Sequence, residues 1–144
     1  MENQSLFTIK KNPTEFQNVK ITSSKVAHEV ISQYYGDDID VFESFFILLV
    51  DRKNTTTGYA KISQGGIAGT VVDIKIIAKY AVDSLASGVI LAHNHPSGNL
   101  NPSDADKQIT KKIKEALQLL DVQVLDHLIL TSNGYLSFTD ENLM

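Results

Sequence analysis

Residues 91–106 read LAHNHPSGNLNPSDAD and bring two histidines and two aspartates together in a turn-rich stretch. Side chains at positions i and i+2 of an extended segment point to the same side, so His93 and His95 are expected to converge. Two imidazoles on one side suit a first-row transition metal, zinc above all. With one carboxylate added, a tetrahedral zinc ion keeps its fourth position for water, which is typical of a catalytic rather than a structural site.

Two aspartates, Asp104 and Asp106, are candidates for the third ligand, and their spacing alone does not choose between them. Both open an apolar pattern of helical period, so a returning helix could bring either carboxylate back to the histidines. A structural interpretation competes with this one, because Ser103 followed three residues later by Asp106 fits an N-terminal capping box. The two interpretations are compatible, since a capped helix would hold Asp106 rigidly.

A zinc hydrolase also needs a general base beside the attacking water, and Glu43 is the candidate. It lies in the run VFESFFILLV, where a charged residue fits poorly among apolar neighbours. It could equally mark the exposed start of a strand, and periodicity does not decide between the two. His127, in VLDHLIL, could support a metal ligand, but the pattern favours a structural histidine at a sheet edge.

The elements that must position these residues follow from the period of the apolar residues. Helices are expected over residues 22–35, 71–87 and 103–121, the second ending at Gly88, and strands over 7–10, 40–51, 59–66, 88–93, 122–131 and 134–138. The strands at 47–50 and 59–62 should pair as a hairpin. Helices that alternate with strands predict an α/β fold in which helices cover a mixed sheet. The two histidines then lie at the carboxyl end of a strand, where sites in such sheets gather.

Composition narrows the classes of protein and of site. The 144 residues suffice for one domain with a hydrophobic core. The chain has no cysteine, which excludes disulfides, thiol nucleophiles and the cysteine-ligated zinc sites of nucleobase deaminases. A formal net charge of −4 and an isoelectric point of about 5.5 do not favour nucleic acid as a partner. No apolar run reaches the length of a membrane span and no secretory signal opens the sequence, so we expect a cytoplasmic protein without a membrane partner.

The candidate residues, taken together, resemble the JAMM signature of the JAB/MPN metallohydrolases. That signature has an upstream Glu, then His-x-His, seven residues, Ser, two residues and Asp, and it is matched here by Glu43, His93, His95, Ser103 and Asp106. The strings ILAHNHPSG, PSDAD and VLDHLIL are similar to the RadC-like branch of this family. The resemblance extends over about residues 22–144, so we expect a RadC-like JAB/MPN domain there and an N-terminal extension over residues 1–21.

The resemblance implies a fold and a set of roles. The fold would be the cytidine-deaminase-like three-layer α/β/α sandwich with a mixed, curved sheet. Zn²⁺ would be bound by His93, His95 and Asp106. Glu43 would hydrogen-bond the zinc water and serve as general base, then as proton donor to the leaving amine. Ser103 would help to hold the oxyanion of the tetrahedral intermediate, a task for which a hydroxyl donor is suited.

The resemblance implies a zinc-dependent hydrolase that cleaves a peptide or isopeptide bond in a protein or peptide substrate. One alternative is a RadC-like accessory protein in DNA repair or recombination. Longer RadC proteins carry an N-terminal helix-hairpin-helix segment for which residues 1–21 leave no room, which weakens a DNA role inherited from the family name. Another alternative is a scaffold or dimerisation module. Edge strands around residues 59–66 could pair with a substrate chain or with a second copy in a homo-oligomer.

Overall fold

The computed structural model describes residues 16–66 and 69–144, so the strand expected over residues 7–10 lies outside the described part. The helices and strands in chain order are α1 (Ser24–Ile31), β1 (Ser44–Val50), β2 (Thr56–Gln64), α2 (Ile74–Asp83), β3 (Gly88–Asn94), α3 (Asp104–Gln118), β4 (Gln123–Thr131) and β5 (Gly134–Ser137). Two short 3₁₀ helices, Ser32–Tyr34 and Asp37–Asp40, connect α1 to β1. The other expected helices and strands are therefore confirmed, with shifted ends.

The end of α2 differs from the expectation, because the helix stops at Asp83 and not at Gly88. Leu85 adopts a left-handed backbone with a φ of 53°. The amide of Ala86 then turns back and donates to the carbonyl of Ala81, at 3.0 Å, which closes the helix end. Gly88 consequently belongs to β3 and begins it. Because leucine rarely adopts a left-handed backbone and glycine does so readily, the sequence pattern favoured Gly88 as the end of the helix.

The five strands form one mixed sheet in the order β2-β1-β3-β4-β5. All neighbouring strands are antiparallel except β3 and β4, which are parallel. A parallel pair requires a crossover, and α3 supplies it. The expected hairpin of β1 and β2 is confirmed, with Ile47 opposite Ala60 and Leu48 opposite Tyr59.

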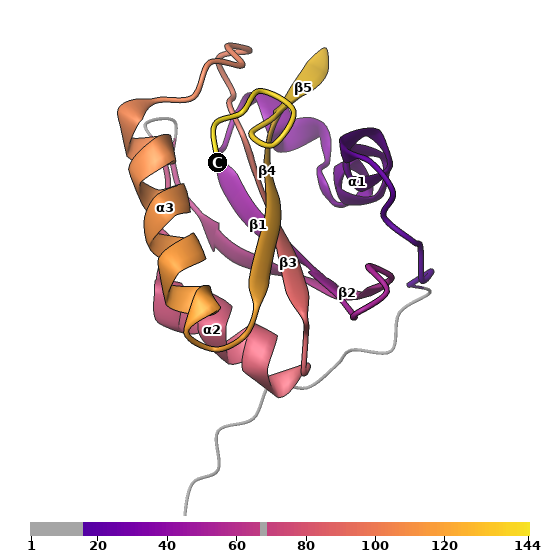
Figure 1. Cartoon of the computed structure of the whole chain (residues 1–144). Helices are drawn as coiled ribbons and strands as arrows, with labels where there is room; N and C mark the ends of the chain where they lie inside the picture. The colour runs from indigo at the N-terminus through magenta and orange to yellow at the C-terminus, as the bar shows by residue number, and fades with distance from the viewer. Residues whose placement is uncertain (1–15, 67–68) are drawn as a thin grey trace, which may run out of the picture.

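Helices cover both faces of the sheet, which confirms the three-layer α/β/α sandwich (Figure 1). One hydrophobic core packs the sheet against α2 and α3 and contains Ile77, Ile113 and Leu117. The other packs the opposite face against α1 and contains Ala27, Val30 and Ile31. All seven residues of β1 are buried, because that strand has a core on each side.

The alternation along β3 determines where the two histidines point. Val89 and Leu91 belong to the core under α2 and α3, whereas Ile90 and Ala92 belong to the core under α1. His93 continues the first row, so its ring lies on the face that α3 crosses. The strand ends at Asn94, and the chain turns through residues 95–103 before α3 returns across the same face.

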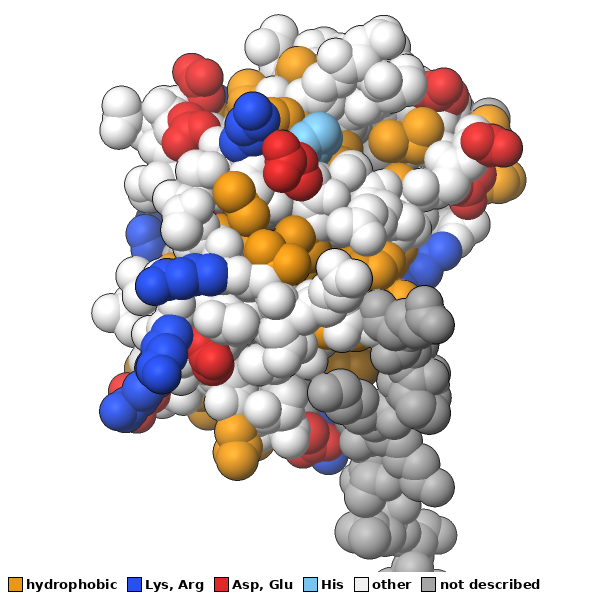
Figure 2. All heavy atoms as spheres, turned by 90° about the vertical axis from the view of Figure 1, so that its right-hand side faces the viewer, with side chains coloured by type: hydrophobic (Ala, Val, Ile, Leu, Met, Phe, Trp, Pro, Cys, Tyr) orange, Lys and Arg blue, Asp and Glu red, His pale blue; other side chains and the backbone are white. Residues whose placement is uncertain are grey.

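The strand β2 lies at an edge of the sheet, as expected for residues 59–66. Hydrophobic side chains are exposed over the face on which α1 and β2 lie, with acidic and basic side chains around them (Figure 2). Tyr59 of β2 is one of the exposed apolar residues. Within residues 16–66 and 69–144, no helix has both the length and the apolar character that crossing a bilayer requires.

Candidate metal centre

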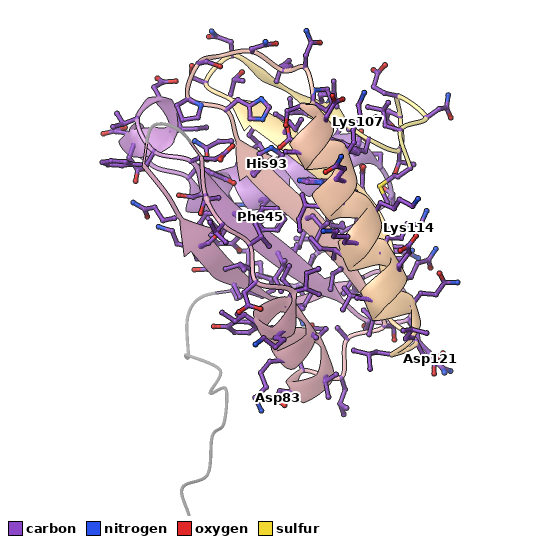
Figure 3. The ribbon with its side chains drawn as sticks, turned by 90° about the vertical axis from the view of Figure 1, so that its left-hand side faces the viewer. Phe45, Asp83, His93, Lys107, Lys114 and Asp121 are labelled. Atoms are coloured by element: carbon purple, nitrogen blue, oxygen red, sulfur yellow. The ribbon has the colours of Figure 1, made fainter. Side chains whose placement is uncertain are left out.

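His93 and His95 converge as their spacing predicts. Their Nε2 atoms lie 3.0 Å apart. The Nδ1 atom of His95 is 2.6 Å from the carbonyl oxygen of Asn99. A carbonyl only accepts, so Nδ1 of His95 carries the proton and Nε2 is left with a free lone pair. That lone pair faces Nε2 of His93 and the carboxylate of Asp106 at the start of α3. His93 lies on the side of β3 that faces the first turns of α3 (Figure 3).

Asp106, and not Asp104, reaches the two imidazoles. Its Oδ1 atom lies 3.3 Å from Nε2 of His93, and its Oδ2 atom lies 3.2 Å from Nε2 of His95. Asp104 lies one residue past the helix cap and is exposed. Two residues correspond to roughly 200° around an α-helix, so the two aspartates lie on opposite sides of α3. Asp104 is on the exposed side and Asp106 on the side toward the sheet, which explains why the carboxylate of Asp106 meets the histidines.

The predicted capping box is present at the start of α3. The hydroxyl of Ser103 accepts from the amide of Asp106 at 3.0 Å, and Oδ2 of Asp106 accepts from the amide of Ser103 at 2.8 Å. The bonds leave Oδ1 of Asp106 free of the cap and fix its carboxyl group in space. They also leave the hydroxyl proton of Ser103 available, because the oxygen is used only as an acceptor.

The donor set of these three side chains fits a divalent cation. The atoms that face one another are two imidazole nitrogens and one carboxylate, between 3.0 and 3.3 Å apart. Ligands of tetrahedral zinc at about 2.0–2.1 Å from the metal lie about 3.3 Å from one another. Lone pairs this close repel unless a positive charge lies between them. The arrangement therefore suits zinc in both spacing and charge.

The titration behaviour of the carboxylate and of one imidazole supports this assignment of charge. Burial by itself would raise the pKa of Asp106, but the adjacent imidazoles of His93 and His95 outweigh it and hold that pKa well below its ordinary range. The adjacent Asp106 carboxylate raises the pKa of His95 against the opposing effect of its partial burial, so the space between these side chains attracts positive charge, a proton or a cation. Asp106 consequently stays ionised at neutral pH and supplies negative charge to the site.

Glu43 lies beside the two histidines, although it is distant from them in the sequence. It immediately precedes β1, and its carboxylate and the ring nitrogens of His93 and His95 lie within 4.8 Å of one another. The side chain is half-buried. A carboxylate at this distance can reach a water molecule that a cation between the ligands would hold.

Asn94, the residue between the two histidines, holds the segment that carries Glu43. It is fully buried, at 0% exposure, and points to the opposite face of the sheet. Its Oδ1 atom accepts from the amide of Ser44 at 2.7 Å. Its Nδ2 atom donates to the carbonyls of Ile39 and Phe42, each at 2.7 Å. The backbone on both sides of Glu43 is thus fixed to the strand that carries the histidines.

Two further hydrogen bonds restrain the backbone at Glu43, and a glycine leaves room for its side chain. The amide of Gly65 donates to the Glu43 carbonyl at 2.9 Å. The hydroxyl of Tyr35 donates to the Ser44 carbonyl at 2.9 Å, and burial, with a smaller effect of the Glu43 charge, raises the pKa of Tyr35 well above its ordinary value. A side chain at Gly69, which has a φ of 125°, would put its Cβ atom 3.1 Å from Oε2 of Glu43. The glycine therefore leaves room for the carboxylate.

Glu43 lines two cavities. One, of about 280 Å³, has mainly apolar walls between β1, residues 70–72 and the first turns of α3. The other, of about 260 Å³, follows the turn after β3 and is lined by His95, Ser97 and Asn99 among others. A ligand beside Glu43 would therefore have space in two cavities.

The sheet-edge interpretation of His127 was wrong. The residue lies in β4, which has β3 on one side and β5 on the other, and its exposure is 0%. Its Nε2 atom is 2.7 Å from Nδ1 of His93, and its Nδ1 atom is 2.6 Å from the hydroxyl oxygen of Thr110 in α3. Burial lowers the pKa of His127 well below its ordinary value, so the ring is neutral. Sequence reasoning missed Thr110 and Asn94, because His127 is 17 residues from Thr110 and the partners of Asn94 are 50 to 55 residues away.

Comparison with known proteins gives one family and several relatives. A family model described as the RadC-like JAB domain matches residues 21–143. The chain is 50% identical over 124 residues to a UPF0758 protein of Flavobacterium johnsoniae, which covers 86% of this chain and 53% of the relative. It is 39% identical over 125 residues to a UPF0758 protein of Porphyromonas gingivalis, with 86% of this chain and 54% of the relative covered.

A third relative is the UPF0758 protein YfjY of Escherichia coli, which is 40% identical over 102 residues. That match covers 71% of this chain and 64% of the relative. The chain thus spans about half the length of the first two curated relatives. The names of these relatives state no activity.

Proposed function

Because the chain belongs to the RadC-like JAB domain family, we propose that it is a zinc-dependent hydrolase that cleaves an amide bond in a protein or peptide. One observation carries this proposal. Lone-pair atoms of His93, His95 and Asp106 meet at 3.0–3.3 Å, beside the carboxylate of Glu43. Two histidines, one carboxylate and an open fourth position are typical of catalytic zinc sites.

His93, His95 and Asp106 would hold Zn²⁺ in this site. When bound, Zn²⁺ supplies a Lewis acid that polarises a carbonyl group and lowers the pKa of water to about 7. Asp106 offsets part of the cation's charge, and its place in the capping box keeps its carboxylate directed at the histidines.

Glu43 would move the proton in the reaction. Amide hydrolysis adds water across the carbon–nitrogen bond, so one proton must leave the attacking water and one must reach the leaving amine. A single carboxylate beside the site can accept the first and deliver it to the amine nitrogen as the bond breaks. The contacts of Asn94 and Tyr35 on either side of Glu43 keep that carboxylate in place.

Ser103 would stabilise the developing oxyanion. Its oxygen is occupied as acceptor from the Asp106 amide, so its hydroxyl proton is free to donate into the site. Loss of one such donor costs on the order of 10²–10³ in turnover. The two cavities beside Glu43 favour a chain-like substrate, which could be an ordinary peptide or an isopeptide-linked one.

Metal analysis tests the ligand set. After reconstitution with Zn²⁺ and dialysis, the wild-type protein should retain about one ion per chain. Asp106→Asn removes the charge while keeping the shape, and it should lose most of this zinc. Asp104→Asn, a matched change two residues away, should retain it. Equal zinc contents in the two variants would contradict the assignment of Asp106.

Peptide-library profiling tests the activity. The zinc-loaded wild type should cleave a set of peptides that Glu43→Gln leaves intact, because an amide cannot accept the proton. The expected loss in turnover is on the order of 10²–10⁴-fold, with zinc content unchanged. Full turnover by Glu43→Gln on a confirmed substrate would overturn the mechanism.

A further inference from the structure

His127 and Thr110 connect two of the three candidate ligands through a continuous chain of hydrogen bonds. Nδ1 of His93 is 2.7 Å from Nε2 of His127, and Nδ1 of His127 is 2.6 Å from Oγ1 of Thr110. The Thr110 hydroxyl is in turn 2.6 Å from the backbone carbonyl of Asp106. This series of hydrogen bonds therefore begins at His93, a candidate ligand on β3, and ends at Asp106, the candidate ligand on α3.

The position of every proton in this series of hydrogen bonds follows from its last acceptor, the carbonyl of Asp106. The Asp106 carbonyl can only accept, so Thr110 donates its hydroxyl proton to it. The Thr110 oxygen must then accept from Nδ1–H of His127, which leaves a lone pair on Nε2 of that ring. That lone pair accepts from Nδ1–H of His93. Nε2 of His93 consequently has no proton and points its lone pair at His95 and Asp106.

We propose that His127 and Thr110 are positioning residues that fix the tautomer and ring orientation of His93 and thereby raise the affinity of the site for zinc. The inference rests on the proposed function in that it takes His93 to be a zinc ligand. Histidine ligands usually donate their second N–H to a carboxylate, a backbone carbonyl or a water. Here a second, neutral imidazole takes that place and adds no charge to the centre.

The surroundings of His127 leave its ring little freedom to turn. The Phe138 ring stacks on it at a centroid distance of 4.7 Å, and the Phe45 ring meets it edge-on at 5.5 Å. Both nitrogens of His127 already have partners, and the side chain is fully buried. A ring held in this way can impose its own orientation on His93, which is itself only 3% exposed.

A role in stability alone would predict a different result from a role in metal binding. Any buried imidazole needs partners for both nitrogens, so removing His127 lowers the free energy of unfolding in either case. Only the proposed role predicts that removing the Thr110 hydroxyl, which touches no ligand side chain, changes the affinity for zinc. Without that hydroxyl, His127 can adopt the other tautomer, which presents Nε2–H to His93 and removes the acceptor.

The test compares zinc affinity, measured by competition with a chromophoric chelator, and the visible absorption spectrum after Co²⁺ substitution. Thr110→Val keeps the side-chain shape and should weaken zinc binding by about tenfold; His127→Leu should weaken it by about 10–100-fold. Both should change the Co²⁺ spectrum, because the orientation of a ligand changes. His127→Gln, whose amide oxygen can accept from His93, should recover part of the affinity lost in His127→Leu.

Thr131→Val is the matched control, because Thr131 is a buried threonine whose hydroxyl donates within the β4–β5 turn. It should bind zinc as the wild type does. If His127→Leu does not fold, Thr110→Val alone decides the matter. Wild-type affinity and an unchanged Co²⁺ spectrum in Thr110→Val, together with a loss of zinc in His93→Ala, would overturn the positioning role and leave the proposed function intact. Wild-type zinc affinity in His93→Ala would overturn both.

Discussion

Asn94 is a single side chain that links two segments of the candidate site. Its neighbours in the sequence, His93 and His95, point to one face of the sheet, while its amide points to the other and holds the backbone on both sides of Glu43. The amide group uses one acceptor and two donors, all in a fully buried place. The distance between Glu43 and the histidines therefore depends on a residue that makes no contact with the centre of the site.

We expect Asn94→Ala to lower the free energy of unfolding by about 2–3 kcal/mol, because it leaves one buried amide and two partly buried carbonyls without partners. Urea unfolding monitored by circular dichroism measures this change. Asn18→Ala, at an exposed position, should change stability by less than about 0.5 kcal/mol. An Asn94→Ala protein as stable as the Asn18→Ala protein would show that these three bonds do not hold the Glu43 segment.

At the residue scale, sequence reasoning succeeded where the signal is local. His93 and His95 are two residues apart, and the capping box of Ser103 and Asp106 extends over one helical turn, so strand and helix geometry place their side chains directly. The same reasoning left Asp104 and Asp106 as alternatives, because the side of the first helical turn that faces the sheet depends on how the whole helix packs on it. It gave no role to Asn94, whose partners are 50 to 55 residues away, and favoured the wrong place for His127.

At the scale of elements, α3 contributes to both the fold and the candidate site. It is the crossover between β3 and β4, and its first turn carries the third candidate ligand. Its amphipathic pattern buries Ile113 and Leu117 against the sheet, which fixes the height of that first turn above His93. The sequence predicted this helix from its period, but the ends of α1 and α2 were misplaced because 3₁₀ turns and a left-handed leucine replaced regular helix there.

Substitution of Ser103 should separate its two roles at the start of α3. Ser103→Ala removes the cap and should lower the free energy of unfolding by about 1 kcal/mol, whereas Ser103→Asn retains a capping oxygen and should preserve stability. Thermal unfolding of the two variants checks this expectation. If Ser103 also donates to an oxyanion, Ser103→Ala should reduce turnover by on the order of 10²–10³-fold at a temperature where it is fully folded. Equal stability of Ser103→Ala and the wild type would contradict the capping role.

At the scale of the whole molecule, the largely buried phenol of Tyr35 should make the protein less stable at alkaline pH. Burial raises its pKa in the folded protein well above the value of about 10 for an unfolded chain. Above about pH 10, Tyr35 loses its proton in the unfolded state but keeps it in the folded state, so the free energy of unfolding falls as pH rises. The contribution is fully present below about pH 10 and decreases by about 1.4 kcal/mol for each further pH unit up to the folded pKa.

Urea unfolding of the wild type and of Tyr35→Phe between about pH 8 and pH 11 measures this effect. The difference in stability between the two proteins should be constant at the lower end and should shrink above about pH 10, because Phe cannot ionise. Other tyrosines and lysines are common to both proteins and cancel in the difference. A difference that stays constant over the whole range would mean that Tyr35 ionises equally well in the folded state.

The charge distribution of the whole molecule bears on the alternative of a DNA-linked accessory protein. The chain has 13 basic and 17 acidic side chains, and both signs are mixed on the face shown in Figure 2. Among the described residues, four lysines are exposed on α3, Lys107, Lys111, Lys112 and Lys114, but Asp104 and Glu115 are exposed on the same helix. Duplex binding depends on the release of counterions by a basic surface, and this surface is small.

We therefore expect no binding to a fluorescently labelled DNA duplex at micromolar protein and about 150 mM salt, measured by anisotropy. The same titration at about 20 mM salt is the more sensitive test, because phosphate contacts strengthen steeply as salt is removed. Binding there that weakens with salt and disappears in a Lys107→Ala, Lys111→Ala, Lys114→Ala triple variant would assign a nucleic-acid surface to α3. Since α3 also carries Asp106, such binding would place DNA next to the candidate metal centre, and a substrate would then have to be sought among proteins bound to DNA.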